Sequence, residues 1–147
     1  MKVSLISLLL LTITLTSCKE EIKVHEFPGR NFEKIMAFKM NGEEGEVVED
    51  GAISDKVIGE GKLLTKRESR KLLGIFHDKS SYGESAYLCF EPHVGYVFYD
   101  NENEIIAHST ICLKCNWMKN FPAVGGYAFS EKGNKRFEKF EEKIFQK

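Results

Sequence analysis

The architecture of this chain follows from one run of residues, Val94-Gly95-Tyr96-Val97-Phe98-Tyr99-Asp100-Asn101-Glu102-Asn103-Glu104-Ile105-Ile106-Ala107-His108-Ser109-Thr110-Ile111-Cys112-Leu113. Residues 94–99 and 104–113 are rich in β-branched and aromatic side chains, and polar residues separate them. Asp and Asn favour turns because their side chains hydrogen-bond to the nearby backbone. The pattern predicts a β-hairpin in which opposed residues have numbers that sum to about 203–205.

Two helices are expected, one on each side of this hairpin. Thr65-Lys66-Arg67-Glu68 has the form of a capping box, in which the Thr and Glu side chains satisfy free amides at a helix start. That helix should run to about Phe76. Ser130 can cap a second helix that continues through Phe145. Its apolar residues recur at a spacing close to three or four: Phe137, Phe140, Ile144 and Phe145.

Further strands are expected around the first helix. Residues 32–40 have strand character and stop at Asn41-Gly42, a strong turn signal, so residues 45–49 are expected to return as the partner strand. One more short strand is expected within 57–64 and another at 86–90. The order predicts an α+β fold with an antiparallel sheet, a hairpin or meander with one helix before the cysteine-containing hairpin and one at the C-terminus.

The N-terminus predicts export. Lys2 precedes an uncharged apolar run over residues 3–15, typical of a secretory signal and too short for a membrane span of about 20 residues. Leu15-Thr16-Ser17-Cys18 resembles the bacterial lipobox, so we expect cleavage before Cys18 and lipid on its thiol. An ordinary signal peptide or a buried N-terminal helix are the alternatives. Lys19 takes the place of the Asp that retains enterobacterial lipoproteins in the inner membrane, which favours the outer membrane.

Composition sets the expected organisation. Residues 1–17 form the signal peptide, 18–31 the lipidated cysteine and tether, and 32–147 a single α+β domain. Without residues 1–17 the chain has 20 Lys and Arg against 22 Asp and Glu, a formal charge of −2. A protein that binds nucleic acid would need a clustered basic excess, so we expect no nucleic-acid partner.

The hairpin is expected to gather three cysteines and a histidine at the end away from its turn: Cys89, His93, Cys112 and Cys115. The register places Cys115 opposite Cys89 and His93 opposite Ile111. In a regular ladder Cys89, His93 and Cys115 share a face while Cys112 points the other way. A site with all four ligands therefore requires the chain to bend between Cys112 and Cys115.

Four interpretations of this cluster remain open. A structural zinc site with three thiolates and one imidazole fits the residue types and spacing. A disulfide fits an exported compartment but leaves one thiol over. A thiol oxidoreductase would have C-x-x-C at the start of a helix, whereas only a short helix at 116–120 is expected before Pro122. The thiols can also be small core residues. Structural zinc or a disulfide is favoured over redox use.

The remaining polar residues predict no reaction. His108 falls in mid-strand opposite about Tyr96, as packed or edge histidines do. The chain contains no G-x-S-x-G, no H-E-x-x-H and no phosphate-binding loop. We therefore assign no catalytic residue.

A second line of inference comes from the motif Cys89-Phe90-Glu91-Pro92-His93-Val94-Gly95, which is C-x-x-P-H-x-G, followed by the C-x-x-C of residues 112–115. With residues 64–69 and 129–133, these segments resemble a group of small bacterial proteins without an assigned reaction, many of them lipoproteins. The resemblance implies that the cysteines and His93 belong to one motif, and it transfers no active site. The expectation is a membrane-anchored, non-enzymatic envelope binding or accessory module, the alternative being a thiol-redox or metal-handling protein.

Overall fold

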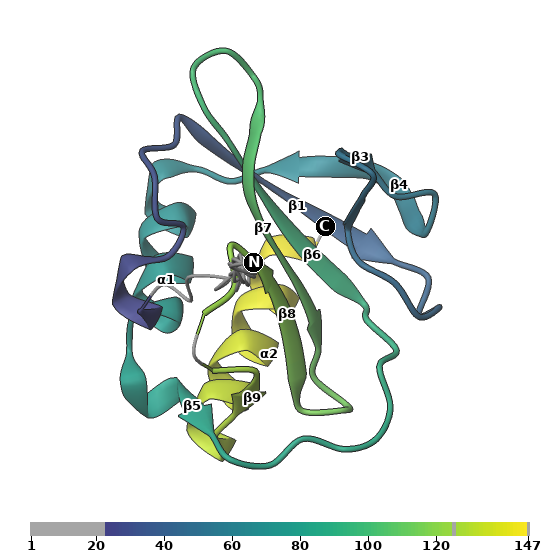
Figure 1. Cartoon of the computed structure of the whole chain (residues 1–147), viewed down its shortest axis with the longest axis vertical. Coiled ribbons are helices and arrows are strands. Elements are labelled where there is room, and N and C mark those ends of the chain that lie inside the picture. The colour runs from purple at the N-terminus through teal and green to yellow at the C-terminus, as the bar shows by residue number, and fades with distance from the viewer. Residues whose placement is uncertain (1–22, 125, 147) are drawn as a thin grey trace, which may run out of the picture.

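A computed structural model describes residues 23–124 and 126–146 of the chain. Figure 1 shows a twisted antiparallel sheet with helices α1 and α2 packed beside it. The sheet has seven strands in the order β4-β1-β6-β7-β8-β9-β5, and β2 and β3 form a separate pair. The strands are β1 Lys34–Met40, β2 Val48–Glu49, β3 Ala52–Ile53, β4 Val57–Leu63, β5 Tyr82–Gly83, β6 Val94–Tyr99, β7 Ile105–Cys112, β8 Trp117–Phe121 and β9 Ala128–Phe129. The helices are η1 Val24–Glu26, α1 Lys66–Phe76, η2 Lys79–Ser81 and α2 Glu131–Phe145. The predicted α+β class with an antiparallel sheet is confirmed.

The predicted hairpin is β6 and β7 at the centre of the sheet. Its register runs from Val94 opposite Ile111 to Phe98 opposite Ala107, within the predicted range. The Asp100 carboxylate closes the turn by accepting hydrogen bonds from the backbone amides of Glu102 at 2.9 Å and Glu104 at 3.0 Å. The hairpin register is therefore confirmed as predicted.

Both predicted helices begin at their predicted caps. The Thr65 hydroxyl accepts from the Glu68 amide at 3.2 Å, and the Glu68 carboxylate accepts from the Thr65 amide at 2.8 Å. The Ser130 hydroxyl accepts from the Gly133 amide at 3.0 Å. A Cβ on Gly133 would lie 1.9 Å from the carbonyl oxygen of Ser81, so α2 packs against η2 as closely as a glycine permits.

The two faces of the sheet carry separate cores. The face under α1 and α2 buries a large aromatic cluster that includes Phe76, Tyr96, Phe98 and Phe137. The opposite face buries a smaller cluster, and the segment between β1 and β4 covers it. Its buried members are Phe38, Met40, Val47, Val48 and Val97.

The expected partner of the first strand was wrong. β1 pairs with β4 and β6, and residues 45–49 instead cross over the sheet. The Val47 amide donates to the Thr110 hydroxyl at 2.8 Å. A Cβ on Gly95 would lie 2.2 Å from the Val47 side chain, so the missing side chain of Gly95 makes the space that Val47 fills.

Two expectations near the cysteines were also wrong. Residues 86–90 form no strand, although the Tyr87 amide donates to the Cys115 carbonyl at 2.9 Å. Residues 117–121 are strand β8 and not part of a helix. Asn116 has a φ of +55°, a left-handed conformation that Asn tolerates, and it reverses the chain from β7 into β8.

The packed domain begins before residue 32, where the tether was expected to end. Phe27 is 1% exposed and contacts Phe76 with ring centroids 5.1 Å apart. The Phe27 carbonyl also lies 2.6 Å from Nε2 of His77, at the end of α1. Of the expected tether 18–31, the described residues 23–31 therefore include a segment that packs on the domain.

Candidate functional site

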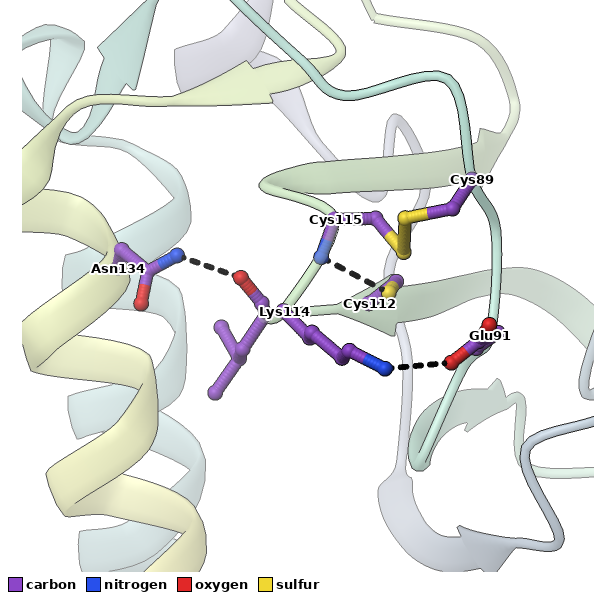
Figure 2. Close-up of a disulfide and its surroundings, with 7 residues drawn as sticks. Cys89, Glu91, Cys112, Lys114, Cys115 and Asn134 are labelled. Atoms are coloured by element: carbon purple, nitrogen blue, oxygen red, sulfur yellow. Dashed lines mark hydrogen bonds and ion pairs between the residues drawn. A yellow bond between two sulfur atoms is a disulfide. The ribbon is translucent and has the colours of Figure 1, made fainter.

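Cys89 and Cys115 form a disulfide that links the segment before β6 to the turn between β7 and β8. Figure 2 shows the two sulfur atoms bonded, and the Cα atoms lie 5.6 Å apart across a sequence separation of 26. The hairpin register had placed these residues opposite each other, and the structure brings them together.

Cys112, the other cysteine of the C-x-x-C motif, is free and fully buried. Its sulfur accepts a hydrogen bond from the Cys115 amide at 3.1 Å, as Figure 2 shows. It packs in a small cluster with Phe90, and Trp117 lies against it. The C-x-x-C motif is thus a turn between two strands, with both cysteines buried, Cys115 bonded to Cys89 and Cys112 unbonded.

Two polar contacts hold this turn to the rest of the domain. The Asn134 side-chain amide of α2 donates to the Leu113 carbonyl at 2.9 Å, and the Lys114 ammonium lies 3.0 Å from the Glu91 carboxylate (Figure 2). The disulfide, the turn between β7 and β8, and α2 are therefore connected to one another.

His93 does not join the cysteines. It is exposed, and its ring lies beside Gly42, where a Cβ would be 3.4 Å from Nε2. Within residues 23–124 and 126–146, no three His, Cys, Asp or Glu side chains gather as metal ligands would. Cys18, the expected lipidation site, lies outside the described residues.

A cleft lies at the loop-covered face of the sheet, with a volume of about 700 Å³. One wall comes from the segment before and within β2, and the other from β7, β8 and the residues that follow β8. Its lining residues are Glu44, Gly45, Glu46, Val48, Glu49, Asp50, His108, Lys119, Asn120, Phe121, Pro122 and Ala123. Clefts of this size with a few converging polar groups are the usual form of small-molecule sites.

His108 is the most buried ionisable group of this cleft. It is 7% exposed and stacks on Phe121, with ring centroids 5.6 Å apart and planes at 16°. Burial lowers the pKa of His108 to about 4, so the imidazole is neutral at pH 7. Its Nδ1 is buried without a hydrogen-bond partner in the described structure and lies 3.7 Å from the Glu46 carboxylate.

The carboxylates around His108 are held by the same loop. Burial raises the pKa of Glu46, with the positive charge of Lys119 acting in the opposite direction. The Glu46 amide donates to the Glu49 carboxylate at 3.1 Å, and Glu49 pairs with Lys56 at 2.7 Å. Oδ1 of Asn120 is a second buried atom that lacks a partner among the described residues.

The lining of this cleft is rich in groups that accept hydrogen bonds. Among the described residues that line it there is no Ser, Thr or Cys beside the imidazole. It offers a neutral imidazole, a carboxamide oxygen and several carboxylates, and Lys119 is its one cation among the described residues. Such a surface accepts hydrogen bonds and favours a ligand with donors and positive charge.

Sequence reasoning treated His108 as a packed histidine and did not connect it to Glu46. His108 lies opposite Val97 in β6 and Phe121 in β8. The predicted hairpin register had placed it opposite about Tyr96, one residue away. The missing information was the path of residues 45–49 over the sheet, which no local pattern encodes. A histidine in an otherwise apolar strand run was the available signal.

Comparison of the chain with models of protein families, with curated proteins and with solved structures found no match in any of the three. No helix in the described part of the chain is long and apolar enough to cross a membrane.

Proposed function

We propose that this chain is a lipoprotein of the bacterial cell envelope, anchored through Cys18, whose domain binds a small polar ligand without transforming it. The cleft around His108 carries the binding role, because two of its lining residues, His108 and Asn120, each hold a buried polar atom without a partner in the described structure. Buried polar groups are normally satisfied, and an unsatisfied one at a cleft is a natural contact for a ligand or an ordered water.

Two independent features support the envelope location. The lipobox Leu15-Thr16-Ser17-Cys18 follows an uncharged apolar run, and lipids on such a cysteine give stable anchoring when two or more chains are attached. The Cys89–Cys115 disulfide fits an oxidising compartment, where thiols do not stay reduced. The outer membrane is the proposed membrane, from Lys19 after the cysteine.

The alternative, a thiol-redox or metal-handling protein, has less support. Cys112 and Cys115 are both fully buried, whereas reactive cysteines need access to their substrates. Their motif also lies in the turn between β7 and β8 and not at the start of a helix. His93, needed as the fourth ligand of a zinc site, points elsewhere.

Anchoring is tested by expressing the full chain in a bacterium supplied with an alkyne analogue of palmitate. We expect a labelled, membrane-associated product whose mass corresponds to a diacylated or triacylated chain that starts at Cys18. The Cys18→Ser variant should lose both the label and the mass of the acyl chains, while Cys112→Ala should keep both. A label that persists in Cys18→Ser would contradict lipidation at this residue.

Ligand binding is tested with L-argininamide, a small cation with several N–H donors, against protein labelled for NMR. We expect saturable shifts centred on His108 and Asn120. Glu46→Gln should weaken binding about tenfold, since it removes a charge-assisted hydrogen bond, and Glu102→Gln in the distant hairpin turn should change nothing. Shifts that do not saturate, or equal losses in both variants, would refute this ligand chemistry.

A further inference from the structure

A basic groove runs between α1 and α2, on the helical side of the molecule and separate from the His108 cleft. Its volume is about 470 Å³. Its lining residues are Lys71, Gly74, Ile75, Arg136, Lys139, Phe140 and Lys143. Four of these are cations and none is a carboxylate. The whole chain is close to neutral, with a formal charge of −1, so this is a local concentration of positive charge.

The cations of the groove differ in what holds them. Arg136 is fixed within the fold, since it lies 2.6 Å from the Asp78 carboxylate and donates to the Gly74 carbonyl at 3.1 Å. Lys71, Lys139 and Lys143 are exposed, and no carboxylate of the described residues lies within ion-pair distance of them.

Lys71 and Lys143 also repel each other. The neighbouring Lys143 amine, with a smaller effect of Arg67, lowers the pKa of Lys71. An arrangement of adjacent like charges costs free energy unless an anion lies between them. The lysines of the groove would therefore be stabilised by an external anion. The apolar residues at its base, Ile75 and Phe140, are each only 5% exposed, so they offer little surface to an apolar ligand.

The path of the chain places this side of the domain close to the proposed anchor. Phe27 packs on Phe76 and contacts His77 at the C-terminal end of α1. α1 is also the helix that supplies one wall of the groove. Cys18 is nine residues before Phe27. Nine residues span at most roughly 32 Å in any conformation, so a lipid on Cys18 would hold the C-terminal end of α1 within that distance of the bilayer.

We propose that the groove of Lys71, Lys139 and Lys143 docks on the phosphate headgroups of anionic phospholipid, so that the lipoprotein lies with α1 and α2 toward its own membrane. The orientation rests on the proposed anchoring at Cys18, whereas the affinity of the groove for anionic lipid does not. Lysines near an anionic surface attract it within about a Debye length. This orientation would also direct the His108 cleft, on the opposite face of the sheet, away from the lipid.

The groove is tested with the chain from residue 18 carrying Cys18→Ser, which keeps every described residue and has no lipid. We expect it to sediment with vesicles of 30% phosphatidylglycerol in phosphatidylcholine and not with phosphatidylcholine alone, and to dissociate as salt rises. Lys71→Gln/Lys139→Gln/Lys143→Gln should reduce the partition constant by about tenfold or more. The matched control Lys34→Gln/Lys114→Gln/Lys119→Gln removes as many charges and should change it less than about threefold.

Equal losses in the two triple variants would show diffuse attraction and overturn the groove, as would an absence of binding to the anionic vesicles. Displacement by millimolar glycerol phosphate would overturn the membrane role and assign the groove to a free anion. Because this protein carries no lipid, a failure here is separate from a failure of lipidation, which the mass of the native product reports.

Orientation is tested on the lipidated protein in the same vesicles by lysine acetylation and mass spectrometry. Lys71, Lys139 and Lys143 should be modified at least about fivefold more slowly than in detergent, while Lys34 and Lys114 should be unchanged. Equal modification of both sets of lysines would overturn the proposed orientation.

Discussion

The two faces of the seven-stranded sheet are covered in different ways. α1 and α2 cover one face with long apolar stripes and bury a continuous aromatic core. The other face is covered by the segment between β1 and β4, whose two short strands bury a smaller cluster. Beside that cluster the cover ends and the His108 cleft opens. A complete cover provides stability, and an incomplete one leaves polar groups available for a ligand.

The largest effect is expected on the helical face. Phe137 is fully buried and contacts Phe76 and Phe129, with ring centroids 5.2 Å and 4.8 Å apart. Phe137→Ala should lower the free energy of unfolding by about 3–5 kcal/mol, as removal of a core aromatic does. Urea denaturation measures it. Val47→Ala on the loop-covered face is the comparison, and a loss as large as that of Phe137→Ala would contradict the ranking of the two faces.

The disulfide should contribute next, since it links the segment before β6 to the turn between β7 and β8. The double change Cys89→Ala/Cys115→Ala should lower the free energy of unfolding by about 2–4 kcal/mol, because an unbridged unfolded chain gains conformational freedom. Cys112→Ala, which leaves the bridge intact, is the control in the same denaturation experiment. If reduction of the wild-type protein leaves its unfolding midpoint unchanged, the bridge has no such role.

Glu141 gives the helical face a pH dependence. Burial, with a smaller effect of Glu138, raises the pKa of Glu141 to about 8. Its protonated form therefore favours the folded state, and this contribution is complete below the unfolded pKa of 4.5 and is lost as pH rises toward 8. Glu141→Gln should stabilise the protein by about 2 kcal/mol at pH 8.5 and much less at pH 5. Thermal unfolding at both pH values tests this, and an equal shift at both would contradict the buried acid.

The smallest effect is expected at His108, on the loop-covered face, and it has the opposite sign to a core truncation. Because burial lowers the pKa of His108 from 6.5 to about 4, the folded state favours the neutral imidazole. This contribution to stability is complete above pH 6.5 and is lost as pH falls toward 4. His108→Leu removes a buried atom without a partner and should stabilise the fold by about 1 kcal/mol at pH 7. Denaturant titration measures the gain, and NMR with L-argininamide should report lost binding. A destabilised variant would indicate that His108 is a structural residue.

The parts of the fold that could be predicted were those specified locally. The hairpin register follows from its turn at Asp100, and the helices follow from caps at Thr65 and Ser130, because each signal acts within a few residues. The register even placed Cys115 opposite Cys89. These predictions depend on hydrogen bonds between near neighbours in sequence.

The parts that could not be predicted depend on contacts between distant segments. Val47 crosses the sheet because Gly95 leaves a space there, and neither residue reveals this alone. His93 leaves the cysteines and lies beside Gly42 for the same kind of reason. One wall of the His108 cleft is formed by that crossing segment, so the position of His108 in the sequence carried no signal of the cleft.

The Cys89–Cys115 bond has a mechanical consequence if the chain is held by one end, as we propose. It closes a ring that contains the whole β6–β7 hairpin. Tension between the two ends of the chain passes through the sulfur atoms and bypasses the ring. The chain between the cysteines, a sequence separation of 26, then cannot be drawn out, which withholds roughly 90 Å of extended chain. Even if the strands around it were pulled apart, the central hairpin would bear no load until the disulfide was reduced.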